Sequence, residues 1–242
     1  MRKVILRVEN VSKKFGGVVA LNNVSFDVYQ GEFLGIIGPN GSGKTTLFNI
    51  ITGFIKPDKG RIIYENIDIT NMKPYEIARL GIARTFQIMK PLENLSTYEN
   101  LVIYALPTSR NVKEAREKAD KVIRLVGLYE KKDLLAKDLN AVEKRRLELA
   151  RALLREPKLL LLDEVLAGHS VAEIDKTLEL LRKIHASGIT IIMIEHVMRA
   201  IMKISERIIV LNYGNIIAEG SPKDVASDPK VVEAYLGRSM IL

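Results

Sequence analysis

The stretch Gly38-Pro39-Asn40-Gly41-Ser42-Gly43-Lys44-Thr45-Thr46 determines how the rest of the chain is interpreted. It matches the pattern G-x-x-x-x-G-K-[ST], in which glycines let backbone N–H groups approach a chain of phosphates. The apolar run from Phe33 to Ile37 precedes it, and a helical run from Thr45 to Thr52 follows it. A strand, a glycine-rich turn and a helix N-terminus together make an anion site. The sequence therefore predicts that all residues of the quoted stretch bind a nucleotide. A turn without a ligand is the plainer alternative.

A second acidic motif supports this prediction. The apolar run from Leu159 to Leu162 ends in Asp163 and Glu164, at the sheet edge where α/β folds bind ligands. Lys44 would place a positive charge on the β- and γ-phosphates of ATP, while Thr45 and Asp163 would hold Mg²⁺. Glu164 is the natural general base for an attacking water. A helix cap or a solvated turn is the alternative role for the two carboxylates.

The hydrophobic pattern predicts an α/β fold. The runs 33–38, 159–162 and 189–194 are almost continuously apolar, as in parallel strands covered on both faces. Residues 1–35 and 60–70 alternate instead, which indicates antiparallel strands. Between about 91 and 140 the pattern is mostly helical, with Ser96 or Thr97 as a cap and an amphipathic stretch from Val112 to Val126.

Composition excludes several classes of protein. The chain of 242 residues has no cysteine, so disulfides and thiolate metal sites are impossible. No apolar run reaches the roughly 18 residues of a membrane-spanning helix. The N-terminus resembles a first strand more than a secretory signal, so we expect a cytoplasmic protein. The net charge of +8 suits nucleic acid, an anionic membrane face or simply a solvated basic surface.

Beyond these motifs, the chain resembles the ABC ATPases over nearly its whole length. Gln87, in Ala83-Arg84-Thr85-Phe86-Gln87, stands where that family has a glutamine that contacts Mg²⁺ and the attacking water. His196, in Ile194-Glu195-His196, matches the family's switch histidine, which contacts the γ-phosphate. Phe15 matches the aromatic residue that stacks on adenine. The plainer alternatives are a core Phe15, a capping His196 and a surface Gln87.

The family's signature segment, LSGGQ in most members, is altered here. Leu139-Asn140-Ala141-Val142-Glu143 occupies its place and keeps only the leucine. The resemblance implies that Asn140, Ala141, Val142 and Glu143 contact the ATP of an opposite subunit. Asn140 could replace the serine as a hydrogen-bond donor. Glu143 would add a negative charge near the phosphates, and Ala141 and Val142 must tolerate the dihedral angles of glycines. Val165 and Gly168-His169 also depart from the family pattern.

Within the family, the chain is most similar to the ATP-binding subunits of branched-chain amino-acid importers of the LivG type. The segments Thr52-Gly-Phe-Ile-Lys-Pro57, Ile194-Glu-His-Val-Met198 and Glu233-Ala-Tyr-Leu-Gly237 carry this resemblance. It implies an ATPase, with ATP and Mg²⁺ as cofactors, that energises import of hydrophobic amino acids. The alternatives are lipopolysaccharide-type export, urea-type import, a nearly inactive regulatory subunit, or a non-transport ABC ATPase acting on DNA or ribosomes.

The same resemblance implies an organisation and a set of partners. One ABC ATPase domain would comprise a P-loop (RecA-like) core with an antiparallel β subdomain, residues 1–86 and 156–242, and a helical subdomain of about 87–155. The protein would sit peripherally on the cytoplasmic face of the membrane. Its partners would be transmembrane permease subunits and a second ABC ATPase, preferably a different one, with no nucleic acid and no contact with the transported substrate. The sequence does not identify that substrate.

Overall fold

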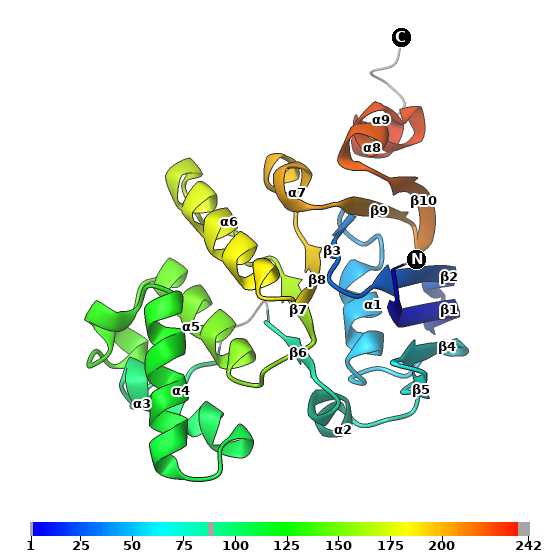
Figure 1. Cartoon of the computed structure of the whole chain (residues 1–242). Helices are drawn as coiled ribbons and strands as arrows, with labels where there is room; N and C mark the ends of the chain where they lie inside the picture. The colour runs from blue at the N-terminus through cyan, green and yellow to red at the C-terminus, as the bar shows by residue number, and fades with distance from the viewer. Residues whose placement is uncertain (1, 87–89, 237–242) are drawn as a thin grey trace.

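The computed structural model describes residues 2–86 and 90–236, which form two β-sheets with helices between and around them (Figure 1). The larger sheet has six strands in the order β10-β9-β3-β8-β7-β6. Its strands are parallel except β10, which runs antiparallel to β9. The three apolar runs of the sequence are its adjacent strands β3, β8 and β7, so the prediction of parallel strands is confirmed. The bounds are β3 Phe33–Ile37, β6 Ile82–Arg84, β7 Leu159–Asp163, β8 Thr190–Ile194, β9 Arg207–Asn212 and β10 Asn215–Gly220.

The smaller sheet is antiparallel, in the order β2-β1-β4-β5. Its residues alternate between buried and exposed positions because one face packs on the core while the other meets solvent. This confirms the prediction from the alternating pattern. The bounds are β1 Val4–Phe15, β2 Val18–Tyr29, β4 Lys59–Tyr64 and β5 Ile67–Asp68.

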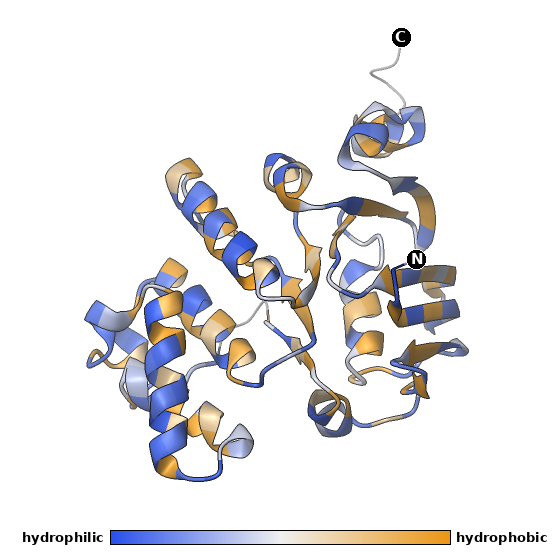
Figure 2. Ribbon diagram, in the orientation of Figure 1, coloured by the Kyte–Doolittle hydropathy of each residue, from blue (hydrophilic) through white to orange (hydrophobic). Residues whose placement is uncertain are grey.

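Two hydrophobic clusters cover the two faces of the larger sheet. Leu34 and Ile36 point to α1 and the smaller sheet, whereas Phe33 and Ile37 point to the opposite cluster, which includes residues of α5, α6 and α7. Figure 2 shows the central strands as mostly hydrophobic and much of α4 as hydrophilic. Burial on both faces explains why β3, β7 and β8 have nearly continuous apolar sequences. The helices here are α1 Lys44–Ile51, α2 Pro74–Arg79, α6 Val171–Ala186, α7 Met198–Ile204, α8 Pro222–Ser227 and α9 Pro229–Leu236.

A mostly helical region lies to one side of the sheets (Figure 1). Ser96 caps its first helix: the Ser96 Oγ accepts a hydrogen bond from the Glu99 N–H, and the Glu99 carboxylate accepts one from the Ser96 N–H. Helices begin at Thr97 and at Val112, so both predicted helices are confirmed. The boundary of this region as a separate subdomain stays a prediction. Its helices are α3 Thr97–Ala105, α4 Val112–Leu125 and α5 Ala141–Leu153, with short turns η1 Leu106–Thr108, η2 Tyr129–Lys131 and η3 Ala136–Asp138.

No helix in the described part of the protein has both the length and the hydropathy needed to span a bilayer.

Candidate functional site

The predicted phosphate-binding loop connects β3 to α1 at the carboxyl edge of the larger sheet. Its backbone requires glycine at two points. Gly43 has φ +105°, and a Cβ there would lie 2.4 Å from the carbonyl oxygen of Ala20. A Cβ on Gly38 would lie 2.0 Å from the carbonyl oxygen of Leu211. The loop therefore packs against β2 and β9 so closely that no side chain fits at these positions.

A cavity of about 220 Å³ opens over this loop. The first residues of the helix α1 line it together with Gly41 and Gly43 of the loop, which suits a series of phosphates. The loop residues Gly38 and Pro39 lie outside the lining. Pro39 lines a neighbouring cavity of about 560 Å³ with residues of α9. The residues around the first cavity are Val18, Ala20, Asn40, Gly41, Ser42, Gly43, Lys44, Thr45, Thr46, Glu164 and His196.

Lys44 is buried in the floor of this cavity. Its Nζ donates to the carbonyl oxygens of Gly38 at 2.8 Å and Pro39 at 2.9 Å. Burial lowers the pKa of Lys44, while the carboxylates of Glu164 and Asp163 partly offset that effect. Carbonyl oxygens are weaker partners for an ammonium group than phosphate oxygens are. The ammonium group can therefore exchange these two bonds for contacts with the β- and γ-phosphates.

The side chain of Asp163 is suited to bind a magnesium ion. It is 1% exposed, and its Oδ1 has no hydrogen-bond partner among the described residues. An unpartnered, buried carboxylate oxygen is costly unless a cation binds it. The exposed Thr45 lines both the phosphate cavity and the larger cavity that Asp163 lines. A hydroxyl and a carboxylate, completed by phosphate oxygens and water, are the oxygen ligands that Mg²⁺ prefers.

Glu164 is held at its backbone and at its carboxylate. Its φ of +49° is uncommon for a residue with a Cβ. Its N–H donates to the carbonyl oxygen of Ile194 at 3.0 Å, and its own carbonyl accepts from the Arg145 guanidinium at 2.9 Å. The Oε1 of Glu164 lies 2.9 Å from the Nε2 of His196, at the rim of the phosphate cavity. The structure thus brings together the two residues that the sequence predicts to act on water and the γ-phosphate.

Glu195 directly precedes His196, and the sequence motifs predict no role for it. It is 2% exposed, and its Oε1 accepts a hydrogen bond from the Leu166 N–H at 2.7 Å. Burial raises its pKa to about 7, although backbone N–H groups of Leu166 and His196 oppose the shift. Glu195 thus ties the end of β8 to the loop that follows Asp163 and Glu164.

The altered signature segment forms the start of α5. The Asn140 Oδ1 accepts from the Glu143 N–H at 2.9 Å, and the Glu143 Oε2 accepts from the Asn140 N–H at 3.0 Å. Ala141 and Val142 are helical, so their side chains cause no backbone strain. Glu143 also pairs with Lys131 at 3.1 Å, which offsets the negative charge expected near the phosphates. The cap uses the side-chain oxygen of Asn140, and the residue itself is exposed.

Of the two predicted residues Gln87 and Phe15, the structure places only Phe15. Gln87 lies outside the described residues. Phe15 is 46% exposed at the end of β1, which removes the alternative that it belongs to the core. It does not line the cavity, but Val18 and Ala20, which follow it on β2, do. An exposed ring beside the phosphate loop is available for stacking on a base.

A groove of about 860 Å³ lies between α2 and the helical region, and the sequence did not predict it. Aromatic side chains of Phe54, Tyr75, Phe86 and Tyr104 line it together with three arginines and Lys90. A buried ion pair between Glu148 and Arg151, 2.7 Å apart, stands in its wall. The groove extends to Thr45 and Asp163, so one continuous lining includes an outer aromatic surface and the proposed metal ligands.

Comparisons with known proteins agree with this geometry. A family model described as "ABC transporter" matches residues 21–167, and one described as "Branched-chain amino acid ATP-binding cassette transporter" matches residues 215–240. The "Probable branched-chain amino acid transport ATP-binding protein LivG" of Archaeoglobus fulgidus is 39% identical, over 96% of this chain and 95% of that protein. The "High-affinity branched-chain amino acid transport ATP-binding protein LivG" of Escherichia coli K12 is 36% identical, over 99% of this chain and 100% of that protein. The crystal structure of the ADP conformation of MJ1267, an ATP-binding cassette of an ABC transporter, has a TM-score of 0.87 at 38% identity, covering 97% and 99% of the two proteins.

Proposed function

The chain belongs to the ATP-binding cassettes of ABC transporters, and on this premise we propose that it energises the import of branched-chain or other hydrophobic amino acids. The observation that carries the proposal is the similarity to the LivG proteins over nearly the full length of both proteins. The family model that matches residues 215–240, near the C-terminus, supports the same subgroup. The transported molecule itself would be selected by other subunits.

The reaction that we propose at the site is transfer of the γ-phosphoryl group of ATP to water, catalysed mainly by positioning and electrostatics. Lys44 and the N–H groups of the phosphate-binding loop bind the phosphates. Thr45 and Asp163, with Gln87, would hold Mg²⁺, which neutralises charge that develops on the phosphate oxygens. The Oδ1 of Asp163, which has no hydrogen-bond partner across residues 2–86 and 90–236, supports this assignment.

Glu164 accepts the proton of the attacking water in this proposal. His196, whose Nε2 lies 2.9 Å from the Glu164 Oε1, orients that carboxylate and contacts the γ-phosphate. The unusual φ of Glu164 and the Arg145 bond to its carbonyl aim the side chain at the cavity. Phe15 stacks on the adenine. The presence of both Glu164 and His196 at the cavity disfavours a nearly inactive regulatory subunit.

A second ATPase subunit would complete the site. In the proposed arrangement the start of α5, from the exposed Asn140 to the half-buried Glu143, faces the nucleotide of the opposite subunit. We favour a heterodimer, in which this altered segment serves just one of two sites. Permease subunits would dock in the aromatic groove between α2 and the helical region, at the cytoplasmic face of the membrane. The exposed aromatic side chains of Phe54, Tyr75 and Phe86 in the groove support a protein segment with an apolar face as its occupant.

The test is an affinity pull-down of the tagged protein from detergent-solubilised native membranes with MgATP. We expect two hydrophobic permeases and a second, similar ATPase to co-purify. The purified assembly, reconstituted in vesicles, should take up labelled leucine, isoleucine or valine when ATP is on the side of this subunit. The matched control is the same assembly carrying Glu164→Gln, which should not take up the labelled amino acid. Uptake of urea, export of lipopolysaccharide, or recovery only with nucleic acid or ribosomes would overturn the import assignment.

A further inference from the structure

Arg84 is the direct neighbour of the proposed metal ligand Asp163. It ends β6, and Asp163 ends the adjacent parallel strand β7. One guanidinium nitrogen of Arg84, NH2, donates to the Asp163 Oδ2 at 2.7 Å, and the two side chains are 6% and 1% exposed. The contact is therefore a buried ion pair at the carboxyl edge of the sheet, where the phosphates would bind.

The guanidinium is itself held by α1 and by two rings. Its other terminal nitrogen donates to the Asn49 Oδ1 at 2.7 Å. The ring centroids of Phe48 and Phe86 lie 5.4 and 5.3 Å from the Arg84 Cζ. A planar cation between a helix amide and two aromatic faces has little freedom to move. The Asp163 Oδ2 is thereby fixed relative to α1, the helix that carries Lys44 and Thr45.

The Arg84–Asp163 pair leaves polar atoms of both side chains without hydrogen bonds, whereas a pair that only stabilised the fold would use them. The Asp163 Oδ1 and the Arg84 Nε both lack a hydrogen-bond partner within the described residues. A two-pronged contact, which uses both carboxylate oxygens, is the stronger arrangement of arginine and carboxylate. The single contact observed here instead leaves the Asp163 Oδ1 without a partner among the described residues, and Asp163 lines the same cavity as Thr45.

The geometry points to Arg84 as a positioning residue: it holds the Asp163 Oδ2 so that Oδ1 remains available, in one orientation, to the magnesium ion. This inference rests on the proposed role of Asp163 as a metal ligand. Groups that hydrogen-bond to ligating carboxylates orient them and strongly affect metal affinity. The arginine also neutralises part of the Asp163 charge, so the ion would bind well only together with the phosphates of the nucleotide.

The test measures metal binding without turnover. Mn²⁺ replaces Mg²⁺ as the probe, and its affinity for the complex of the full-length protein with a non-hydrolysable ATP analogue is followed by electron paramagnetic resonance. We expect Arg84→Gln to weaken Mn²⁺ binding about tenfold, the lower end of the range for such outer contacts. Affinity for the analogue in EDTA should stay within about twofold, because the phosphate-binding loop is unchanged. Arg84→Lys keeps the charge and should recover part of the Mn²⁺ affinity.

Arg79→Gln, at an exposed arginine on the neighbouring helix α2, is the matched control and should alter neither affinity. Unchanged Mn²⁺ affinity in both Arg84 variants would overturn the inference, as would an equal loss of Mn²⁺ and of metal-free analogue binding, which indicates a merely structural role. If Arg84→Gln does not fold, the same two outcomes are read from Arg84→Lys. Asp163→Asn separates the two proposals: normal Mn²⁺ binding in that variant would remove Asp163 as a ligand, whatever Arg84 does.

Discussion

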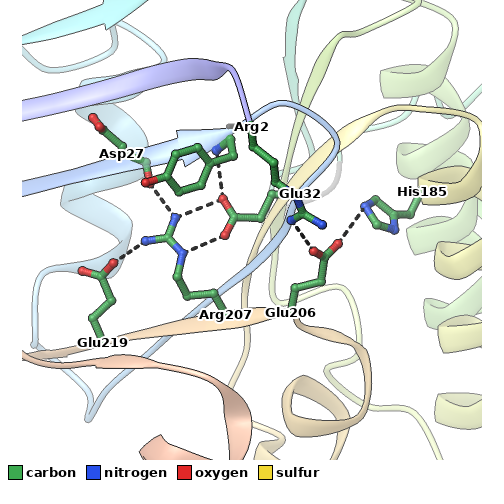
Figure 3. Close-up of polar contacts among 8 residues, drawn as sticks. Arg2, Asp27, Glu32, His185, Glu206, Arg207 and Glu219 are labelled. Atoms are coloured by element: carbon green, nitrogen blue, oxygen red, sulfur yellow. Dashed lines mark hydrogen bonds and ion pairs between the residues drawn. The ribbon is translucent and has the colours of Figure 1, made fainter.

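Two arginine–carboxylate pairs, each with a buried carboxylate, stand at the amino and carboxyl edges of the same six-stranded sheet. At the amino edge, Arg207 pairs with Glu32 through two bonds, from Nε to Oε1 at 2.7 Å and from NH2 to Oε2 at 3.0 Å. The Tyr29 N–H also donates to Glu32, and Arg207 reaches the Asp27 carbonyl and Glu219 (Figure 3). At the carboxyl edge, Arg84 meets only one oxygen of Asp163.

From this difference we expect the amino edge of the sheet to contribute mainly to stability and the carboxyl edge mainly to function. A pair whose polar atoms are nearly all satisfied stabilises the ends of β3 and β9, because desolvation is offset by several hydrogen bonds. A pair with unused polar atoms costs more in the folded protein and leaves an oxygen for a ligand. Variants at the amino edge should therefore change unfolding, and variants at the carboxyl edge should change nucleotide chemistry.

The largest effect is expected from Arg207→Met at the amino edge. It leaves the buried Glu32 carboxylate without its cation, which should lower the free energy of unfolding by about 3–5 kcal/mol. Urea unfolding monitored by circular dichroism measures this change. Arg61→Met, at an exposed arginine paired with Glu9, is the control and should cost less than about 1 kcal/mol. Similar losses for both variants would mean that the amino-edge pair has no special stabilising role.

Glu164→Gln, at the carboxyl edge, should change ATP turnover and leave stability almost unchanged. Loss of the general base should lower ATP turnover about a hundred- to a thousandfold, while ATP affinity and the urea midpoint stay close to those of the unchanged protein. Steady-state hydrolysis by the purified protein, with its partner subunits where they are needed, measures turnover. Full turnover in this variant would remove Glu164 as the base.

Glu195→Gln should change the pH dependence of stability. Burial raises the Glu195 pKa from 4.5 to about 7, so the folded state binds the proton more tightly than the unfolded state does. This contribution is fully present below the unfolded pKa and is lost as pH rises through about 7. Between about pH 5 and pH 8 the unchanged protein should lose up to about 3 kcal/mol of stability relative to Glu195→Gln. Urea titrations at several pH values measure the difference, and parallel pH profiles would contradict the shift.

The smallest effects are expected from the rings that cover the two arginines. Phe86 lies beside Arg84, and the Tyr29 ring centroid lies 5.3 Å from the Arg207 Cζ. Phe86→Leu and Tyr29→Leu each remove one cation–π contact and should each cost about 0.5–1 kcal/mol of stability. Only Phe86→Leu should also weaken Mn²⁺ binding to the nucleotide-bound protein. An equal effect of both variants on Mn²⁺ would show that the two edges are not functionally separate.

Much of the fold could be predicted because its signals are local. The strands β3, β7 and β8 are continuous apolar runs, and the amphipathic stretch predicted from Val112 to Val126 matches α4 Val112–Leu125 to within one residue. Three further signals depend on neighbouring residues alone: the glycines of the phosphate-binding loop, the pair Asp163-Glu164 at the end of a strand, and the cap of α3. The order of the six strands could not be predicted in this way, because β6 joins the sheet next to β7 through contacts between residues far apart in sequence.

The sequence by itself predicted which residues bind phosphate and metal, because glycine spacing and strand-end carboxylates act through the adjacent backbone. The tertiary structure alone decided how those residues are held. Arg84 meets Asp163, Arg145 meets the Glu164 carbonyl and Glu195 meets the Leu166 N–H only when separate elements pack together. Burial then sets their chemistry, since desolvation depends on everything that surrounds a side chain: it lowers the pKa of Lys44 and raises the pKa of Glu195. The same packing leaves the Asp163 Oδ1 without a hydrogen-bond partner in the part of the chain that the structure describes.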